Sequence, residues 1–431
     1  MSHSGADGRR DFWNAQAEQR PHDERRADRE AGLPERIRKA FRAPFYQAVW
    51  SRHQVSPDDY GEPGDLAKFP IVRKDDVREF RSDTGDPYGG LVEPGHPVAL
   101  VSQSSGTSGL PTFQASSARD AEFIAEVMAS CYWGFGIRAG DVVMGGAGGT
   151  QRPIIPIQRA YDLIGATVIL ADRANMNTYV EQLEYFRPQV IGLYTGFLER
   201  LYDAAIAMGR DPKRLLSSLK VAYYTGKRLI PAQRKRLRDE LQVDIYELGG
   251  MGDVGALMAD CVAHDGLHLR DDYFLVENLH VDTHAPQMPD EPGELVYTSM
   301  VDDAMNYVRW GSEDLGCINT APCACGRTTA RLTVYGRIWE RTELNGNIVM
   351  PADIEELILS TYGRECAFQL VRDAASGQAQ AIRLAPYQGA ELTALEASIK
   401  SAFGAAIPVE RSSESEIVAV GRAKYRQVVD G

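Results

Sequence analysis

Between residues 141 and 224, short apolar runs alternate with segments of helical periodicity. Each apolar run is long enough for one buried strand, and the runs cover residues 141–150, which end in glycines, 166–171, 189–194 and 219–224. Helical spacing marks the segments near residues 178–186 and 196–208. This alternation predicts an α/β fold with a largely parallel sheet covered by helices. Ligands of such folds bind beyond the carboxyl ends of the strands, here near residues 145–149, 194–196 and 224–226.

The bulk composition excludes several classes of protein. A chain of 431 residues can build two or three domains with a large core. Its net charge of −13 argues against general nucleic-acid binding, and no apolar run approaches the ~18 residues that a membrane helix needs. The N-terminal residues lack the apolar centre of a signal peptide. We therefore expect a cytoplasmic protein that binds neither nucleic acid nor membranes.

The cysteines of this chain favour metal binding over disulfide formation. Six are spread unevenly, at Cys131, Cys261, Cys317, Cys323, Cys325 and Cys366, which suits a reducing compartment. Cys323 and Cys325 flank a single alanine, and Cys261 lies upstream, shortly before His268. Three thiolates and one imidazole would complete a closed tetrahedral zinc site. His264 is the alternative nitrogen ligand, and reduced thiols without a metal are the alternative to the whole site.

A short loop of hydroxyls and glycines follows an apolar stretch at residues 97–101 that is expected to form a short buried strand. Its residues are Ser104, Ser105, Gly106, Thr107, Ser108 and Gly109. Glycine lets a backbone approach an anion closely, and loop N–H groups with hydroxyls can surround phosphate oxygens. It is not the usual P-loop, because no lysine follows the second glycine. We expect this loop to bind phosphate groups, and an ordinary surface loop is the alternative that composition leaves open.

The order of residues in this loop, SSGTSGLPT, resembles SSGTTGKPT, the phosphate-binding loop of the adenylate-forming enzymes. These enzymes include acyl-CoA ligases, aryl-acid activating enzymes and luciferases. Leu110 stands where they carry a lysine, which removes one mobile cation but leaves the backbone and hydroxyl donors. An earlier block, PFYQAVW followed by DLAKFPIVRKDDVREF, is similar to the N-terminal region of phenylacetate-CoA ligases. The resemblance covers about residues 35–431 and lies in the order of the motifs.

This resemblance implies a large N-terminal domain of layered sheets and helices and a small, mobile α+β C-terminal domain. Residues 335–340 are similar to the family's GRxDD hinge, where Arg337 is retained as a nucleotide-binding residue and Trp339 replaces the hinge aspartate. We therefore expect an adenylation domain over residues 34–336 and a C-terminal domain over residues 337–431. Residues 1–33 are polar and charge-rich and are predicted to form a partly helical extension, with no chemical role assigned.

The segment DIYELGGMG resembles the family motif IYGLSE, in which the tyrosine stacks on adenine and the glutamate helps to hold magnesium. Tyr246 matches the tyrosine. Gly250 takes the place of the glutamate, and Asp253 could replace it only if the loop is reshaped. Lys227 likewise stands where relatives usually carry an acid. Because magnesium retains several waters and uses substrate phosphates, loss of one ligand need not abolish its binding.

Two further motifs complete the resemblance to an adenylate site. RWGSEDL takes the place of RYRTGDL, so that Asp314 matches the carboxylate that accepts hydrogen bonds from both ribose hydroxyls. Arg309, which begins this segment, is either structural or phosphate-facing. Near the C-terminus, GRAKYRQV resembles the terminal GKxxRV motif, whose lysine reaches the acyl phosphate. Lys424 keeps the amine and is the expected catalytic residue, and Arg422 is the alternative in the other register.

The resemblance implies ATP-dependent activation of a carboxylic acid, with an aromatic acid favoured. ATP and the acid would form an acyl-adenylate and pyrophosphate, and CoA would then accept the acyl group. The implied cofactors are ATP, Mg²⁺, CoA and a structural Zn²⁺, since some phenylacetate-CoA ligase relatives carry a similar Cys…GLH…CxCG arrangement. The expected partner is a small-molecule carboxylic acid, and a homodimer is compatible with the family. Two alternatives stay open: adenylation with another acceptor, such as an amine or a carrier-protein thiol, and a non-catalytic nucleotide-binding homologue.

Overall fold

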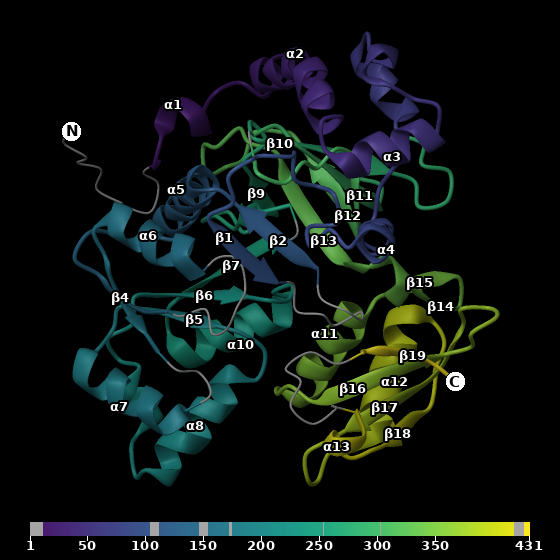
Figure 1. Ribbon diagram of the computed structural model, residues 1–431. Coiled ribbons are helices and arrows are strands. Elements are labelled where there is room, and N and C mark those ends of the chain that lie inside the picture. Colours follow the sequence, from purple (N-terminus) through teal and green to yellow (C-terminus); the bar gives the residue numbers. More distant parts are fainter. Residues whose placement is uncertain are drawn as a thin grey trace. The chain divides into compact units, whose positions relative to one another are not determined.

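The computed structural model describes residues 12–103, 112–145, 154–171, 175–252, 254–301, 303–417 and 426–431 (Figure 1). The chain divides into two compact units. The first unit comprises Met1–Lys227, Val243–Ser312 and Gly316–Thr333, and the second comprises Arg228–Gln242, Glu313–Leu315 and Val334–Gly431. The predicted boundary after residue 336 therefore lies close to the last observed one. Residues 228–242 differ from the expectation, because they group with the C-terminal part of the chain.

Helices form the beginning of the first unit. They are α1 (Ala15–Glu18), α2 (His22–Ala40), α3 (Pro44–Arg52) and α4 (Lys74–Thr84), with 3-10 turns at Pro57–Asp59 and Pro63–Lys68. Leu33, Ile37 and Ala40 recur on one face of α2 and are buried, which gives that helix its packing face. Pro44 occupies the first turn of α3, where its missing N–H costs no helical hydrogen bond.

Two short antiparallel strands flank the predicted phosphate loop. They are β1 (Leu100–Gln103) and β2 (Phe113–Ser116), which pair only with one another. The apolar run at residues 97–101 was expected to be a buried strand, and this expectation is wrong in two respects. The strand begins only at Leu100, and Val101 keeps half of its surface exposed, because β1 lies outside the large sheet.

An eleven-stranded sheet dominates the fold. Its strands, in spatial order, are β10 (Phe274–Leu279), β11 (Gly293–Ser299), β12 (Trp310–Asn319), β13 (Arg331–Arg337), β9 (Leu267–Leu269), β8 (Ala256–Ala259), β7 (Asp244–Met251), β6 (Val221–Thr225), β5 (Val190–Leu193), β3 (Val142–Gly145) and β4 (Thr167–Leu170). The five strands from β7 to β4 run parallel, which confirms the predicted α/β class. On the other side of β7 the pairing is antiparallel: β7 pairs with β8, β8 with β9, and β9 with β13.

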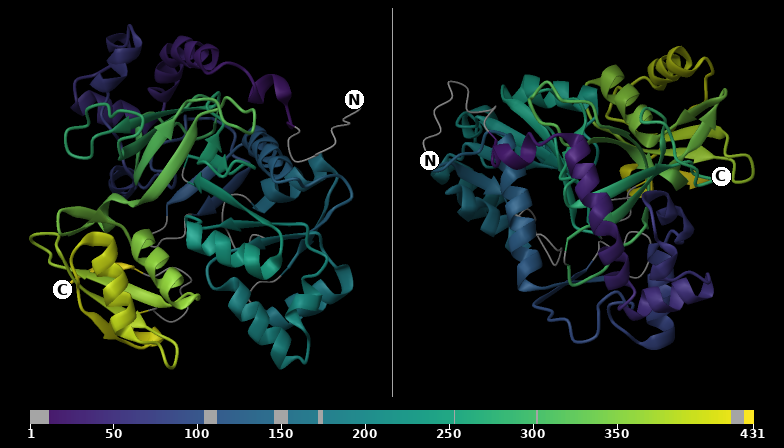
Figure 2. Two further views of the ribbon diagram at one scale, coloured as in Figure 1. Left: turned by 180° about the vertical axis from the view of Figure 1, so that it is seen from behind. Right: turned by 90° about the horizontal axis from the view of Figure 1, so that it is seen from above.

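Helices follow the parallel strands as their alternation predicts. They are α5 (Ala118–Gly134), α6 (Ile154–Ile164), α7 (Met176–Phe186), α8 (Phe197–Ala207), α9 (Pro212–Leu215) and α10 (Pro231–Leu241). Figure 2 shows α5 and α6 lying beside the teal strands of the sheet. Aromatic rings fill the interface, where Tyr132 stacks on Tyr161 with ring centroids 4.6 Å apart and the Tyr161 hydroxyl lies 3.2 Å from that of Tyr223. The sheet and α5 thus share one core.

The second unit has a sheet of its own. Its elements are a 3-10 turn at Ile338–Glu340, β14 (Thr342–Leu344), β15 (Asn347–Val349), α11 (Pro351–Tyr362), β16 (Ala367–Arg372), β17 (Ala379–Ala385), α12 (Leu392–Phe403), β18 (Val409–Arg411), α13 (Glu414–Ile417) and β19 (Val428–Asp430). The strand order is β18-β17-β16-β19. α10 joins this unit through α11, because the Ala232 N–H at the start of α10 donates to the Glu356 carboxylate at 2.9 Å. A carboxylate at this position stabilises the helix, because the N-terminal end of a helix carries a partial positive charge.

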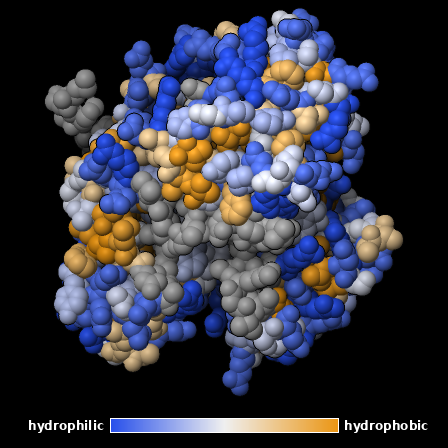
Figure 3. All heavy atoms as spheres, in the orientation of Figure 1, coloured by the Kyte–Doolittle hydropathy of each residue, from blue (hydrophilic) through white to orange (hydrophobic). Residues whose placement is uncertain are grey.

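Hydrophilic residues predominate on the face drawn in Figure 3, and its apolar patches are small and separate. Within the described ranges, none of the helices combines the length and apolarity needed to cross a membrane.

Candidate functional site

The four predicted metal ligands come together in the first unit. Cys261 follows β8, His268 lies in β9, and Cys323 and Cys325 lie in the loop between β12 and β13. Their four ligand atoms lie within 4.8 Å of one another, and all four side chains are buried. The Cys261 and Cys323 sulfurs are 3.7 Å apart, and the Cys325 sulfur is 3.4 Å from His268 Nε2. This convergence agrees with the proposed ligand set.

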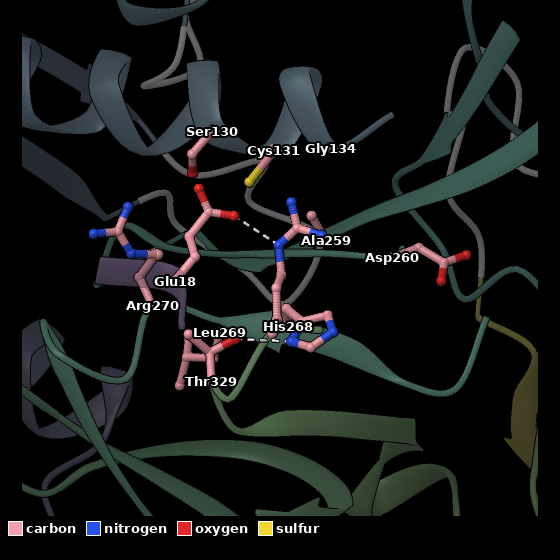
Figure 4. A pocket seen from close by; sticks show the side chains of 11 residues that line it. Glu18, Ser130, Cys131, Gly134, Ala259, Asp260, His268, Leu269, Arg270 and Thr329 are labelled. Carbon is pink, nitrogen blue, oxygen red and sulfur yellow. Dashed lines mark hydrogen bonds and ion pairs between the residues drawn. The ribbon is translucent and has the colours of Figure 1, made fainter. Parts of the chain in front are cut away.

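Local backbone geometry brings the two loop thiols to one side. The Cys323 N–H donates to the Arg327 carbonyl at 3.0 Å, and the Gly326 N–H donates to the Cys323 carbonyl at 2.9 Å. Gly326 has a φ of 91°, in the left-handed region that favours glycine. His268 is fixed by a 2.8 Å hydrogen bond between Nδ1 and the Thr329 hydroxyl (Figure 4). Its Nε2 lies on the side of the Cys325 sulfur, 3.4 Å away. Partners of this kind orient metal-binding histidines in general.

His264 lies outside this group in the described structure. Its Nδ1 is 2.8 Å from an oxygen of Asp260, and its φ is 50°. His268 is therefore the better nitrogen ligand, and the alternative through His264 lacks support.

The charge state of the thiols favours metal binding. The pKa of Cys325 is lowered to about 2, first because the Cys261 thiol donates a hydrogen bond to its sulfur. The same hydrogen bond, together with burial, raises the pKa of Cys261. The low pKa of Cys325 favours its thiolate, which is the form that ligates metals.

Asp314 and Arg337, two of the predicted nucleotide-binding residues, meet in the second unit. The Arg337 Nε atom lies 3.3 Å from an oxygen of Asp314. The Asp314 side chain is 16% exposed and that of Arg337 is 42% exposed, so that both remain accessible to a small ligand. A carboxylate can accept several hydrogen bonds, so this ion pair leaves acceptor capacity for ribose hydroxyls.

Tyr246 is fully buried in β7. Its ring stacks on Phe135 at 5.1 Å between centroids, and His264 lies 5.4 Å away on a tilted plane. The side chain therefore belongs to the core between β7 and α5 in this structure. Stacking on adenine, as the family motif implies, would require these neighbours to move.

Several predicted residues fall outside the described part of the chain. These are the phosphate-loop residues 104–109, the possible carboxylate Asp253, and Lys424 with its alternative Arg422. Gly250 is described as a residue of β7, where it offers no side-chain ligand.

Arg309 is structural. Its guanidinium makes a bidentate ion pair with Glu277, at 3.1 Å for each of Nε and Nη2, and also donates to the Phe69 carbonyl at 2.6 Å. The residue is buried, so the structure decides between the two roles that the motif left open. It ties the segment after the second 3-10 turn to the large sheet.

Sequence reasoning missed the residues that surround the metal-ligand cluster. Arg327 contacts the Cys325 sulfur, and Glu18 from the N-terminal segment pairs with Arg327. The only signal was an arginine directly after the CxCG pattern. Glu18 lies about 300 residues away in the chain, and spacing gives no information about such a contact.

Comparison with known proteins identifies curated relatives of this chain. No family model matches the chain. Its curated relatives include the phenylacetate-coenzyme A ligase of Thermus thermophilus, 27% identical over 81% of this chain and 78% of the relative. The enzyme of the same name from Aromatoleum evansii is 29% identical over 79% of this chain and 77% of the relative. The chain is similar to phenylacetate-CoA ligases over about four fifths of its length.

Solved structures support the fold of this phenylacetate-CoA ligase-like protein. A 2-hydroxyisobutyryl-CoA ligase in its postadenylation state has a TM-score of 0.83, with 22% identity over 100% of this chain and 94% of that one. The amide bond synthetase McbA from Marinactinospora thermotolerans has a TM-score of 0.51, with 16% identity over 74% of this chain and 66% of that one. At these identities the similarity confirms the adenylate-forming fold.

Proposed function

We propose that the protein is an AMP-forming ligase that activates a carboxylic acid with ATP and transfers the acyl group to CoA. The observation that carries this proposal is the match to curated phenylacetate-coenzyme A ligases over about four fifths of the chain, at up to 29% identity. The ion pair of Asp314 and Arg337, two residues of the resemblance, supports it. An aromatic acid is the favoured substrate because the relatives act on phenylacetate.

The proposed reaction has two steps. A carboxylate oxygen attacks the α-phosphorus of ATP, and the bond from that phosphorus to the β-phosphate breaks to release pyrophosphate. The CoA sulfur then attacks the acyl carbon of the adenylate, and AMP leaves with the oxygen that joined acyl carbon and phosphorus. The thiol proton goes to solvent.

In this reaction the protein contributes mainly by electrostatic stabilisation of the negative charge on the phosphate and carboxylate oxygens. We assign the N–H groups and hydroxyls of residues 104–109 to the phosphates of ATP. We assign Lys424 to the carboxylate and α-phosphate oxygens, where negative charge moves as the new bond forms. Asp314 would accept hydrogen bonds from the ribose, and Arg337 would hold that carboxylate in position.

Pyrophosphate release from the purified full-length chain with ATP and a panel of carboxylic acids tests the proposal. We expect release that depends on the acid and is strongest with an aryl- or arylalkyl-substituted one. Thioester formation with CoA then identifies the acceptor. Release without a thioester would favour an amine or carrier-protein thiol instead, and no release with any acid would favour a non-catalytic nucleotide-binding homologue.

Replacing Asp314 with alanine should raise the KM for ATP by about 10- to 100-fold. The change removes hydrogen bonds from ribose hydroxyls to a charged group, and a net loss equal to one such bond, roughly 1.5–3 kcal/mol, corresponds to this range. Steady-state kinetics at saturating acid measure the effect. Asp430→Ala is the matched control, because Asp430 is also paired with an arginine of the second unit but is 54% exposed. An unchanged KM for ATP in Asp314→Ala would remove this carboxylate from the nucleotide site.

We propose that Mg²⁺ accompanies ATP and is held mainly by phosphates and water. Gly250 supplies no side-chain ligand, and magnesium tolerates a shell rich in water. We expect at most one protein carboxylate on the ion. A crystal structure with ATP and Mg²⁺ that has two or more protein carboxylates in the first coordination shell would contradict this.

We also propose that Cys261, His268, Cys323 and Cys325 hold one structural Zn²⁺ per chain. Their chemistry fits the ion, because three thiolates and an imidazole form a closed tetrahedral shell without a position for substrate. Binding would release the remaining thiol protons, because the ligands must be thiolates. The ion would stabilise the fold and would take no part in the reaction.

A cytoplasmic location is part of the proposal, because all six cysteines are free and free thiols suit a reducing compartment. A homodimer remains a prediction, and light scattering on the purified protein tests it.

A further inference from the structure

The N-terminal segment packs directly on the loop that carries two of the four clustered ligands. We define this segment as residues 12–29, which include α1 and the first part of α2. The Thr328 N–H, three residues after Cys325, donates to the Glu18 carbonyl at 3.1 Å. The Phe12 ring lies 5.2 Å from the centre of the Arg327 guanidinium. A segment that composition marked as polar and without a role is therefore in contact with the metal-ligand cluster.

Glu18 and Arg327 form the central contact. Arg327 Nε donates to a Glu18 carboxylate oxygen at 2.7 Å, and the two side chains are only 3% and 9% exposed. The other Glu18 oxygen accepts the Asn14 N–H at 2.8 Å, which fixes the carboxylate within the segment. Figure 4 shows Glu18 and His268 among the side chains that line one pocket.

Arg327 in turn contacts a thiol of the cluster. Its backbone N–H lies 3.5 Å from the Cys325 sulfur, and its Nη1 lies 3.8 Å from the same atom. Three thiolates, a neutral imidazole and a Zn²⁺ ion carry a net charge of −1. A guanidinium that donates to one thiolate offsets this charge, and its own burial is compensated by Glu18.

A small cavity adjoins this chain of contacts. Its volume is about 30 Å³, and its walls include Glu18, Ser130, Cys131, Arg270 and Arg327. Arg327 Nη2 has no hydrogen-bond partner among the described residues, although only 7% of the surface of this residue is exposed. A polar cavity of this size accommodates a water molecule. Glu18 and His268 both line this cavity, so the N-terminal segment borders the space beside the cluster.

The segment is anchored on both sides of Glu18. On one side, Trp13 packs edge-on against Trp133 of α5 at 5.5 Å and donates from its indole nitrogen to Glu126 at 2.6 Å. On the other side, Arg25 Nε lies 2.8 Å from Asp271, and His22 Nδ1 lies 3.0 Å from the same carboxylate. These contacts hold Glu18 against Arg327.

We propose that residues 12–29 are a functional part of the metal centre. Glu18 holds Arg327 as an outer donor to the Cys325 thiolate, and the segment limits the escape of the metal and the access of solutes to the thiols. Arg327 and Glu18 are thus positioning residues for a divalent, thiophilic cation. This inference rests on the proposed zinc site.

The rate of zinc release tests the inference. We expect Glu18→Ala and Arg327→Gln in the full-length, zinc-loaded protein to release zinc to a chromophoric chelator about 10-fold faster or more, the range typical of outer-shell changes. Glu18→Gln removes the charge and keeps one of the two hydrogen-bond acceptors, and it should lie between Glu18→Ala and the parent. Glu24→Gln is the matched control and should match the parent, because Glu24 lies in the same segment with a 60% exposed side chain. Release rates equal to the parent in Glu18→Ala and Arg327→Gln would overturn the inference.

Thiol alkylation provides a second test of the N-terminal segment that does not depend on whether the protein binds zinc. In metal-free protein, iodoacetamide should modify Cys325 faster in Glu18→Ala than in the parent, as mapped by mass spectrometry. A parent protein with well under one zinc per chain would refute the zinc proposal, but this alkylation difference could still be measured. Equal alkylation rates in parent and variant would refute the shielding role of the segment. Circular dichroism of each variant confirms that the comparison is between folded proteins.

Discussion

Lys424→Ala should lower adenylate formation at least ~100-fold while leaving ATP binding nearly unchanged. The expected contact of the lysine bridges the carboxylate and the α-phosphate, and it strengthens as charge moves onto the oxygens of the transition state. An interaction of this kind lowers kcat more than it changes ground-state affinity. Acid-dependent pyrophosphate release measures the rate, and equilibrium titration with ATP measures the binding.

Two further variants make the Lys424 test specific. Lys400→Ala removes an exposed lysine from α12 of the same unit and should leave the rate within about 2-fold of the parent. Arg422→Ala tests the other register of the terminal motif. Equal pyrophosphate release by Lys424→Ala and the parent would exclude Lys424 from the mechanism, and a large loss in Arg422→Ala would then assign the role to Arg422.

Cys325→Ser should abolish stoichiometric zinc binding and lower the melting temperature by at least ~5 °C. Serine is a poor zinc ligand, and loss of one ligand from a closed shell removes the ion that joins the loop after β8 to the loop after β12. Because metal binding contributes directly to folding free energy, stability should fall before chemistry is affected. Elemental analysis and thermal denaturation of protein purified without chelator provide the two measurements.

Two controls separate the metal from general effects of losing a thiol or a histidine. Cys317→Ser changes a cysteine of β12 that does not belong to the four-residue cluster and should keep full zinc content. His264→Asn should also keep zinc, because His264 pairs with Asp260 rather than with the thiols. Retention of one zinc per chain by Cys325→Ser would exclude that residue as a ligand, and loss of zinc in His264→Asn would reverse the choice of histidine.

The sequence predicted the features that depend on local pattern. Strands β3, β5 and β6 follow from apolar runs separated by helical spacing, because burial on both faces of a parallel strand leaves a continuous apolar run. The same pattern located β4, although this edge strand is partly exposed. The proximity of Cys323 and Cys325 follows from their spacing in a tight turn. The adenylate-forming fold followed from the order of several weak motifs, and comparison with known proteins bears it out.

Features that depend on distant contacts could not be predicted in this way. Residues 97–101 are apolar enough for a buried strand. Whether such a strand is buried depends on the sheet it joins, and β1 joins β2 in a separate two-stranded sheet. Glu18 is a charged residue in a charged segment, and its burial depends on Arg327, which lies far along the chain. The sequence motif left Arg309 either structural or phosphate-facing, and its ion pair with Glu277 is visible only in the structure. In each case the partner is set by tertiary structure.

The α10 helix is a related case. The chain enters it directly from β6 and leaves it towards β7, so sequence order assigns it to the large domain. Contacts assign it to the second unit, where the Gln233 amide also donates to Glu365 at 2.5 Å. Sequence order alone does not determine which neighbour a surface helix packs against.

The central claim is that an acyl-adenylate lies on the reaction path, and oxygen transfer tests it most directly. The purified protein would be incubated with ATP, CoA and an accepted acid whose carboxylate carries two ¹⁸O atoms. The proposed path predicts one ¹⁸O in the phosphate of AMP and one in the thioester carbonyl, as measured by mass spectrometry. AMP without the label, or formation of ADP and inorganic phosphate in place of AMP and pyrophosphate, would contradict it.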